Sequence, residues 1–359
     1  MGPPKTGTSA VQKWLSSNQS FLREHGVFYP SHSVDANGVS SGNVKSVYDI
    51  EEKKPVSLNK GRLTNLINTF NASKHSILLL SSEFFFREMD VLKHHIPNAK
   101  FIAYVRNPME IKESSYNQSV KRHFKLDKIY PKRSKQLPFM TRLVEFSNAY
   151  GADDLYLRLY GERYFKNGNI ASDLLSVIGI EVSVELPVIN NSYQFEALEF
   201  KRWFNQFHSE VYQGHVDTAL QGFVAGQSHY SLIPEKQYLE DSAYYASELE
   251  NYAKELKNFD LAPLVADMKS ASSKPYFSQE LSEADFLAVC QYLQSVLQID
   301  YYLMIKQLKS CSPVKNKNFY DLFLKSYSKR AQFIYQMSLV RGKLRKIVKT
   351  IMKVLRNVF

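Results

Sequence analysis

The residue types best suited to chemistry gather at the start of the sequence, in the run GPPKTGTS at residues 2–9. A lysine there supplies a positive charge, and a glycine lets the backbone approach an anion closely. Apolar residues recur at helical spacing from Ala10 to Leu22, so the loop opens a helix whose N-terminus favours negative charge. We therefore expect the loop to bind a phosphate or sulfate group. The residues expected to contact that group are Lys5, Thr6, Gly7, Thr8 and Ser9.

The loop differs from the Walker loop of ATP-binding enzymes at one position. Gly2 and Gly7 fit the frame G-x-x-x-x-G, but Thr8 stands where a Walker loop has lysine. The lysine of this run, Lys5, lies inside the loop instead. A kinase-like P-loop enzyme is therefore one alternative, and a plain helix N-cap after a turn is another interpretation of so short a motif.

A second group of residues that could bind an anion follows the apolar run from Phe101 to Val105. Arg106 comes directly after this run, and Ser114 stands eight residues beyond it. An arginine at the carboxyl end of a parallel strand lies where open α/β sheets bind ligands, and it can donate two hydrogen bonds to a phosphate. Pro108 starts a helix that presents Ser114 about two turns later. Two such groups predict a ligand with two phosphate-like ends.

The elements that must position these residues alternate between short apolar runs and helical patterns. Residues 76–80 and 101–105 are expected to be buried parallel strands, and 155–159 is expected to be a third strand. A helical stretch at 84–95 separates the first two, so we expect a right-handed βαβ unit. This alternation predicts an α/β fold with a helical C-terminal part. Further elements are expected as a short strand at 27–29 and helices at 136–150, 170–178, 196–212, 236–257 and 282–309.

Together these motifs resemble the sulfotransferase superfamily. PKTGTS resembles that family's loop for the 5'-phosphosulfate, and Arg106 with Ser114 matches its 3'-phosphate motif in residue type and spacing. The segments SSEFFF, LRLYGERYF, DLLSVIGI and NNS resemble bacterial carbohydrate sulfotransferases across residues 1–205, and the likeness extends more loosely over 275–309. The resemblance implies a P-loop NTPase-like three-layer sandwich around a central parallel sheet.

The resemblance also implies a reaction. The donor would be 3'-phosphoadenosine 5'-phosphosulfate (PAPS), with no metal required, and the acceptor would be a hydroxyl or amine of a carbohydrate or glycolipid. Lys5 is the candidate for the cation that meets the charge developing on the leaving group. Glu83 resembles the catalytic base of several carbohydrate sulfotransferases, although a carboxylate favoured by a helix N-terminus is the alternative. The alternative bases are His94, His95 and His123.

Two features of the sequence depart from the family's pattern. The family's loop normally follows a β-strand, whereas this sequence starts at Met1, so we expect an apolar strand to be encoded upstream. The sequence also has no recognisable counterpart of the glycine-rich, tryptophan-bearing loop that closes over the nucleotide in some members. The residues that contact adenine are therefore not assigned.

The positive charge of the sequence is confined to its C-terminal end. Residues 315–359 contain twelve Lys and Arg and one acid, Asp321, so their net charge of +11 equals that of the whole chain. Residues 1–314 are therefore neutral overall, which argues against nucleic-acid binding. We divide the chain into a sulfotransferase domain, 1–314, and a basic tail, 315–359. The amphipathic pattern within 339–359 is typical of a helix on an anionic membrane surface, and equally of a terminal helix packed on its own domain.

The composition excludes several classes of protein. No run approaches the about 20 apolar residues of a membrane-spanning helix, and no signal peptide precedes the loop. Cys290 and Cys311 are too few for a disulfide framework and lack metal-ligand spacing. We expect a cytoplasmic enzyme, held peripherally at the inner face of the cytoplasmic membrane if the tail binds lipid. An inactive membrane-associated scaffold of the same fold is the remaining alternative.

Overall fold

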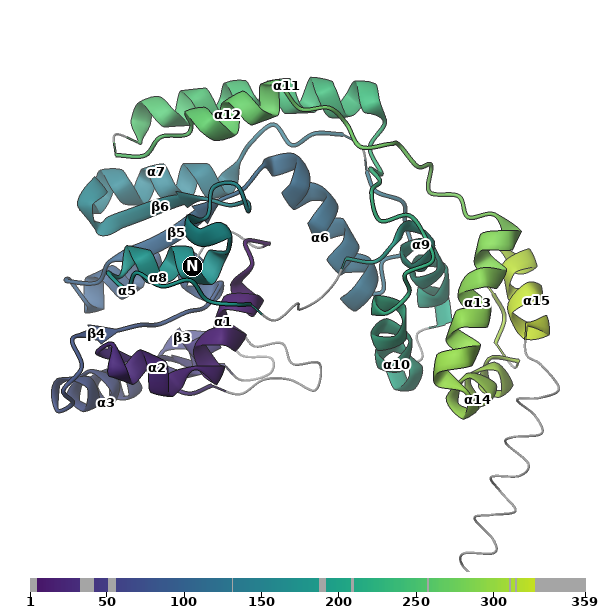
Figure 1. Ribbon diagram of the computed structural model, residues 1–359, viewed down its shortest axis with the longest axis horizontal. Coiled ribbons are helices and arrows are strands. Elements are labelled where there is room, and N and C mark those ends of the chain that lie inside the picture. The colour runs from purple at the N-terminus through teal and green to yellow at the C-terminus, as the bar shows by residue number, and fades with distance from the viewer. Residues whose placement is uncertain are drawn as a thin grey trace, which may run out of the picture. The chain divides into compact units, whose positions relative to one another are not determined.

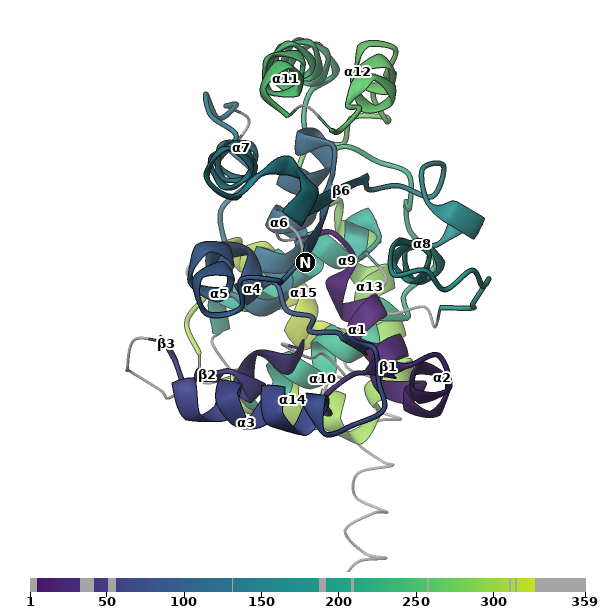
Figure 2. The ribbon, with the colours of Figure 1, turned by 90° about the vertical axis from the view of Figure 1, so that its left-hand side faces the viewer.

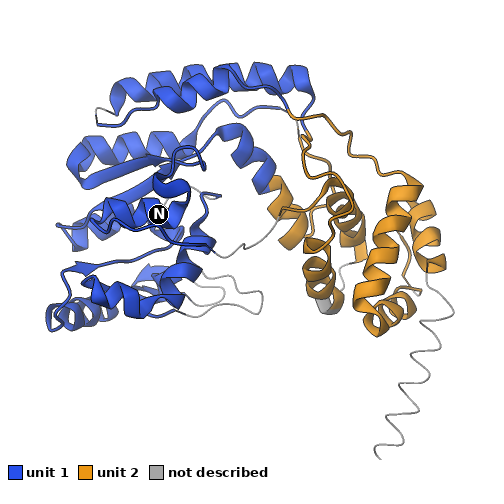
Figure 3. Ribbon diagram, viewed as in Figure 1, with its two compact units in different colours: residues 1–115, 131–191, 233–273 blue, residues 116–130, 192–232, 274–359 orange. Residues whose placement is uncertain are grey.

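The computed structural model describes most of the chain as two compact units, each assembled from three separate stretches (Figure 3). The described residues are 5–32, 42–50, 56–130, 132–186, 192–207, 210–256, 258–309, 311–313 and 315–326. Unit 1 comprises Met1–Ser115, Pro131–Asn191 and Ile233–Ser273, and unit 2 comprises Tyr116–Tyr130, Ser192–Leu232 and Lys274–Phe359. The boundary between the first stretches of the two units therefore falls inside a helix, α6.

Unit 1 contains the strands and the helices that flank them (Figure 1). Its elements are α1 Thr8–Ser17, α2 Gln19–Glu24, β1 Val27–Phe28, η1 Gly42–Ser46, β2 Tyr48–Asp49, β3 Ser57–Leu58, α3 Lys60–Asn71, β4 Ile77–Leu78, α4 Phe84–Arg87, α5 Met89–His95, β5 Phe101–Val105, the first half of α6 Pro108–Arg122, α7 Pro138–Tyr150, η2 Ala152–Asp154, β6 Leu155–Leu159, η3 Lys166–Gly168, α8 Ile170–Val177, α11 Glu235–Glu255 and α12 Ala262–Lys269.

The strands of unit 1 pair as three two-stranded sheets within the described ranges. β5 and β6 are parallel over five residues, from the pair Phe101 and Leu155 onward, and β1 is parallel to β4. β2 and β3 are antiparallel. The chain is therefore an α/β protein. The expected βαβ pairing of 76–80 with 101–105 is not found, because β4 pairs with β1 and β5 with β6; an apolar run indicates a buried strand but does not name its neighbour.

An apolar core in unit 1 joins helices α1 and α8 to both parallel pairs. Trp14 and Leu15 of α1 share one buried cluster with Leu175 of α8, Val27 of β1 and Tyr104 of β5. The end view in Figure 2 also shows α11 and α12 side by side, with α7 next to α11. The loop that precedes α1 is thus attached to a helix anchored against the strands.

Unit 2 is built from helices around an aromatic core. Trp203 of α9 has the rings of Phe200, Phe286 and Phe323 within 6 Å of its own, centroid to centroid. Beginning at Lys315, the predicted tail contributes α15 to this core, where Phe323 is fully buried. The amphipathic stretch 339–359 lies outside the described residues. The elements of unit 2 are the second half of α6, α9 Phe195–Phe204, η4 Asn205–Phe207, α10 Glu210–Gln221, α13 Glu283–Leu297, α14 Ile299–Leu308 and α15 Lys317–Lys325.

Most expected elements are found, and the long helices are where the expectations are wrong. The strands 101–105 and 155–159 are confirmed to the residue. The helix expected at 282–309 is two helices, because Gln298 between them has a positive φ of 47° that a continuing helix cannot accept. The stretches 84–95 and 196–212 are also divided. The first breaks at Glu88, which has φ of −102° and ψ of 14°, and the second after Phe204, where the short helix η4 follows. Amphipathic spacing continues across such breaks, so it cannot locate them.

Candidate functional site

The loop before α1 has a backbone suited to anions. Lys5 and Gly7 both lie in the left-handed region, with φ of 74° and 69°, and Gly7 is the N-cap of α1. Gly7 oxygen accepts the first helical hydrogen bonds, from the amides of Ala10 at 3.1 Å and Val11 at 3.3 Å. Left-handed residues within a short loop turn successive N–H groups toward one side, and the first turn of a helix adds N–H groups without intrahelical partners.

Gly7 is required by both conformation and space. A Cβ built on it would lie 3.2 Å from Cε2 of Tyr160 and 3.3 Å from Cδ1 of Ile170, contacts tighter than side chains normally make. The positive φ adds strain for any residue with a side chain, of about 1 kcal/mol or more. Lys5 already bears such strain, and non-glycine residues held in this region concentrate at functional sites.

Arg106 joins the strand end to the loop. Its Nη1 donates to the backbone oxygen of Lys5 at 2.5 Å, and its Nε donates to Oε2 of Glu110 at 2.9 Å. Its guanidinium lies 4.7 Å from the ring centroid of Tyr160, which directly follows β6. The structure therefore brings together two of the predicted anion-binding groups, from opposite ends of 101 residues of sequence.

The start of α6 places Ser114 on the same side as Glu110. Oδ1 of Asn107 accepts the amide of Met109 at 2.9 Å, and Pro108 occupies the first turn, where its missing N–H is not needed. Ser114 is half-buried and follows Glu110 by four residues, so the two share one face of the helix. Arg106, Glu110 and Ser114 follow one another at intervals of four residues and thus form a row that leads from the carboxyl end of β5 along one face of α6.

Glu83 is the predicted base that contacts the loop. Oγ1 of the buried Thr8 donates to Oε1 of Glu83 at 2.5 Å, while the rest of the Glu83 side chain is exposed. His94 and His95 stand instead in the last turn of α5, where Nδ1 of His95 bonds to Val91 oxygen, and His123 belongs to unit 2.

Hydrogen bonds hold the segment before Glu83 against α1. The amide of Ser81 donates to Oδ1 of Asn43 at 2.9 Å, and the amide of Asn43 donates back to Ser81 oxygen at 3.0 Å. Nε2 of the buried Gln12, from α1, reaches the same oxygen at 3.4 Å. Gly42 next to them approaches so closely that a Cβ would overlap Ser81 oxygen. The position of Glu83 relative to the loop is therefore determined by buried polar contacts.

Two residues of this site, Glu110 and Tyr160, were not predicted from the sequence. Glu110 could have been found, because it follows Arg106 by four residues in a stretch expected to be helical. Tyr160 could have been found because it ends a strand parallel to the one that ends at Arg106, and parallel strands end at the same edge. In the part of the chain that the structure describes, no cluster of His, Cys, Asp and Glu is arranged to hold a metal ion.

Comparisons with known proteins find no relative of this chain: no family model matches it, and neither a curated protein nor a solved structure is significantly similar. A search of the described helices for one able to cross a membrane finds none with the necessary length and apolar content. Any assignment of function therefore depends on the residues of the site and on the sequence motifs.

Proposed function

We propose that this chain is a PAPS-dependent sulfotransferase of P-loop-like sandwich fold that acts on a carbohydrate or glycolipid. The observation that carries the proposal is the hydrogen bond from Arg106 Nη1 to Lys5 oxygen. This hydrogen bond supports a single site with two anion-binding ends. The loop would bind the phosphosulfate, and the row that contains Arg106 and Ser114 would bind the 3'-phosphate. A nucleotide with phosphates on both ribose positions fits two such ends, whereas ATP has a single phosphate chain.

Sulfuryl transfer needs a positive charge at the leaving group. As the bond to sulfur breaks, negative charge grows on the oxygen that stays with the nucleotide phosphate. In the proposed mechanism the Lys5 ammonium meets this charge, while the N–H groups of the loop and of the first turn of α1 hold the phosphate oxygens. The left-handed Lys5 backbone fixes the direction from which that side chain leaves the loop.

The acceptor hydroxyl must lose its proton as it attacks sulfur. Glu83 is the proposed base, because its carboxylate contacts the loop through Thr8 and the rest of the side chain is open to solvent. The second carboxylate oxygen, Oε2, is the proposed proton acceptor, since Oε1 already receives the Thr8 hydrogen bond. A membrane-bound glycolipid acceptor, reached at the inner face of the cytoplasmic membrane through 339–359, belongs to the same proposal.

Calorimetry with adenosine 3',5'-bisphosphate (PAP) and ATP tests the donor assignment. We expect PAP to bind and ATP to bind far more weakly, because ATP lacks the 3'-phosphate. Lys5→Ala should abolish PAPS turnover, by about 100-fold or more, without changing the melting temperature. Lys13→Ala, which removes an exposed lysine from α1, is the matched control and should remain active. Preference for ATP would indicate a kinase-like enzyme, and full activity of the Lys5 variant would contradict the mechanism.

A further inference from the structure

Helix α11 carries a carboxylate that is buried and incompletely satisfied. Asp241 is 0% exposed. Its Oδ1 accepts a hydrogen bond from Nε2 of Gln237 at 2.6 Å, but its Oδ2 accepts none from any residue that the structure describes. A buried charge with an unmatched oxygen is destabilising unless nearby positive charge compensates it. The neighbours of Asp241 therefore determine what this residue does.

Two cations from different segments of unit 1 compensate Asp241. Nζ of Lys112, on α6, lies 3.8 Å from Oδ2, and Nη1 of Arg133 lies 3.6 Å from Oδ1. Both distances exceed a hydrogen bond, so the attraction is between charges. Lys112 Nζ also donates to Lys132 oxygen at 3.3 Å. Burial lowers the pKa of Lys112, and Asp241 opposes that shift.

The segment 132–135 is attached to α11 beside Asp241. The Arg133 guanidinium lies 4.5 Å from the ring centroid of Tyr244. The amide of Ser134 donates to the Tyr245 hydroxyl at 2.9 Å, and the Tyr244 hydroxyl donates to Lys135 oxygen at 3.0 Å. Asp241 thus lies where α6, this segment and α11 are joined within unit 1.

Lys112 lies on the opposite face of α6 from the candidate site. Residues on an α-helix are separated by about 100°, so Lys112 and Ser114 point about 200° apart. Lys112 shares the buried face with Met109, which is 0% exposed, while Glu110 and Ser114 lie on the other face. A contact at Lys112 therefore acts, together with the packing of Met109, on the rotation of α6 about its axis, and with it on the direction of Ser114.

We propose that Asp241, through Lys112, positions α6 so that Ser114 faces the loop, which makes Asp241 a positioning residue for the 3'-phosphate end. This inference rests on the proposed function. Without the carboxylate, the partly buried Lys112 ammonium loses the stronger of the two acidic charges that act on it, Asp241 and Glu113. It then moves toward solvent and turns α6 away from the loop. The phosphosulfate end, held by residues 5–9, does not depend on that rotation.

Ligands with and without the 3'-phosphate separate positioning from general stability. PAP and adenosine 5'-monophosphate (AMP) share the 5'-phosphate, and only PAP reaches the Arg106 and Ser114 row. We expect Asp241→Asn to reduce the preference for PAP over AMP by about tenfold or more, with AMP affinity nearly unchanged, when both are titrated into folded protein. In PAPS turnover the same variant should raise KM more than it lowers kcat.

Two further variants make the result decisive. Lys112→Met keeps the aliphatic stem and removes the charge, so it should reduce the same preference even if Asp241→Asn fails to fold. Asp217→Asn is the matched control. Asp217 is also a buried carboxylate that pairs with a cation of α6, but its partner is Arg122, and both residues belong to unit 2. An unchanged preference in the Lys112 variant, or an equal loss in the control, would overturn the inference. Equal affinity of the wild-type protein for PAP and AMP would refute the proposed function itself.

Discussion

The charge balance around Arg106 has a direct consequence for ligand binding. Two of its nitrogens already donate hydrogen bonds, Nε to Glu110 and Nη1 to Lys5 oxygen. A phosphate that binds the guanidinium with two hydrogen bonds must therefore compete with the Glu110 carboxylate. Glu110 is half exposed, so water can solvate it once it is displaced. Replacing Glu110 by a phosphate at Arg106 therefore costs little free energy, but the cost is not zero.

Removing that competitor should strengthen binding. We predict that Glu110→Gln increases PAP affinity about two- to fivefold, because a partly exposed ion pair is worth up to about 1 kcal/mol. Isothermal titration at low salt is the appropriate measurement, and the gain should shrink as salt screens the pair. Glu113→Gln, three residues further along the same helix, removes an equal charge away from the Arg106 contact. A weaker PAP complex in the Glu110 variant would mean that Glu110 orients Arg106 instead of competing for it.

The site residues differ in how visible they are in the sequence. Lys5, Gly7 and Arg106 stand in motifs with a recognisable spacing, and Glu110 follows from helical periodicity once Arg106 is noticed. Asp241 belongs to no motif; it is one acid among several on a long helix, and its importance comes from burial beside two cations supplied by other segments. Such a residue becomes identifiable only when the packing of α11 is known.

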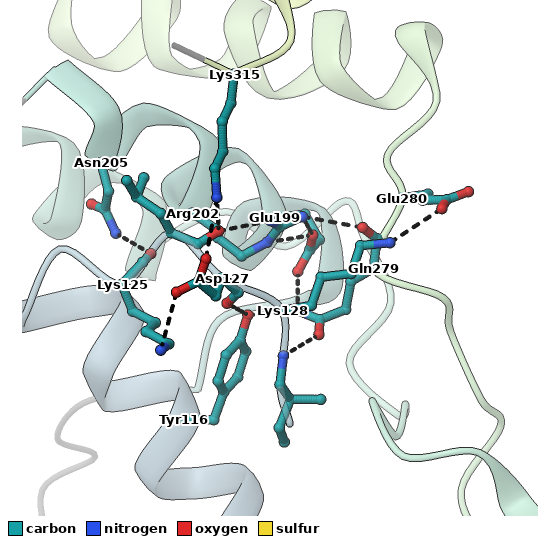
Figure 4. Close-up of polar contacts among 12 residues, drawn as sticks. Tyr116, Lys125, Asp127, Lys128, Glu199, Arg202, Asn205, Gln279, Glu280 and Lys315 are labelled. Atoms are coloured by element: carbon teal, nitrogen blue, oxygen red, sulfur yellow. Dashed lines mark hydrogen bonds and ion pairs between the residues drawn. The ribbon is translucent and has the colours of Figure 1, made fainter. Parts of the chain in front are cut away.

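At the scale of elements, one polar network fixes the loop that follows α6 in unit 2 (Figure 4). Arg202 of α9 donates to Leu126 oxygen at 3.0 Å, and its Nε and Nη2 both reach Oε2 of Glu199, which is 1% exposed. Gln279 links the network to Tyr116 and accepts the amide of Ile129 at 2.6 Å. The loop is thus held by side chains from two distant parts of the sequence.

Truncating the arginine should destabilise unit 2 strongly. We expect Arg202→Ala to lower the free energy of unfolding by about 3 kcal/mol or more, since it leaves the buried Glu199 carboxylate without its cation. Urea denaturation followed by circular dichroism measures the change. Lys128→Ala is the control, because it removes an exposed ion pair with Glu280 from the same loop and should cost less than about 1 kcal/mol. Similar losses in the two variants would show that the network does not depend on burial.

The type of an element could be predicted from the sequence where a short run rich in apolar residues indicated a strand. The run 101–105 is short, apolar and bounded by polar residues, and 155–159 is short and rich in leucine; they form β5 and β6 with the expected bounds. The pairing of strands was not predictable in the same way, because β1 with β4 and β5 with β6 are chosen by three-dimensional packing. The break at Gln298 depends on one backbone angle, which apolar periodicity does not encode.

At the scale of the whole molecule, a buried lysine should influence how stability varies with pH. Lys201 of α9 is 1% exposed, and burial lowers its pKa to about 8. In the unfolded chain the same amine keeps its proton up to its ordinary pKa of 10.5. Between these two values the unfolded state binds more protons, so the contribution of Lys201 to stability rises with pH.

Comparison of the wild-type protein with Lys201→Met isolates this contribution. We predict that the stability of the wild type, relative to the variant, increases from about pH 8 toward pH 10, by at most about 1.4 kcal/mol per pH unit. Urea unfolding at intervals of one pH unit provides the curves, and other titrating groups cancel in the difference. Lys236→Met, at an exposed position, should run parallel to the wild type. A constant difference for the Lys201 variant would contradict the lowered pKa.

Because each unit consists of three separate stretches of sequence, the order in which the units can fold during synthesis is constrained. Unit 1 ends at Ser273, so its last helices, α11 and α12, leave the ribosome long after the loop and β5 have emerged. Unit 2 cannot complete its aromatic core until α15 is available. Neither unit is a contiguous piece that can fold early and wait for the other. The strands of unit 1 therefore emerge before α11 and α12 are available to complete that unit, and strand edges exposed at this stage favour pairing with other chains.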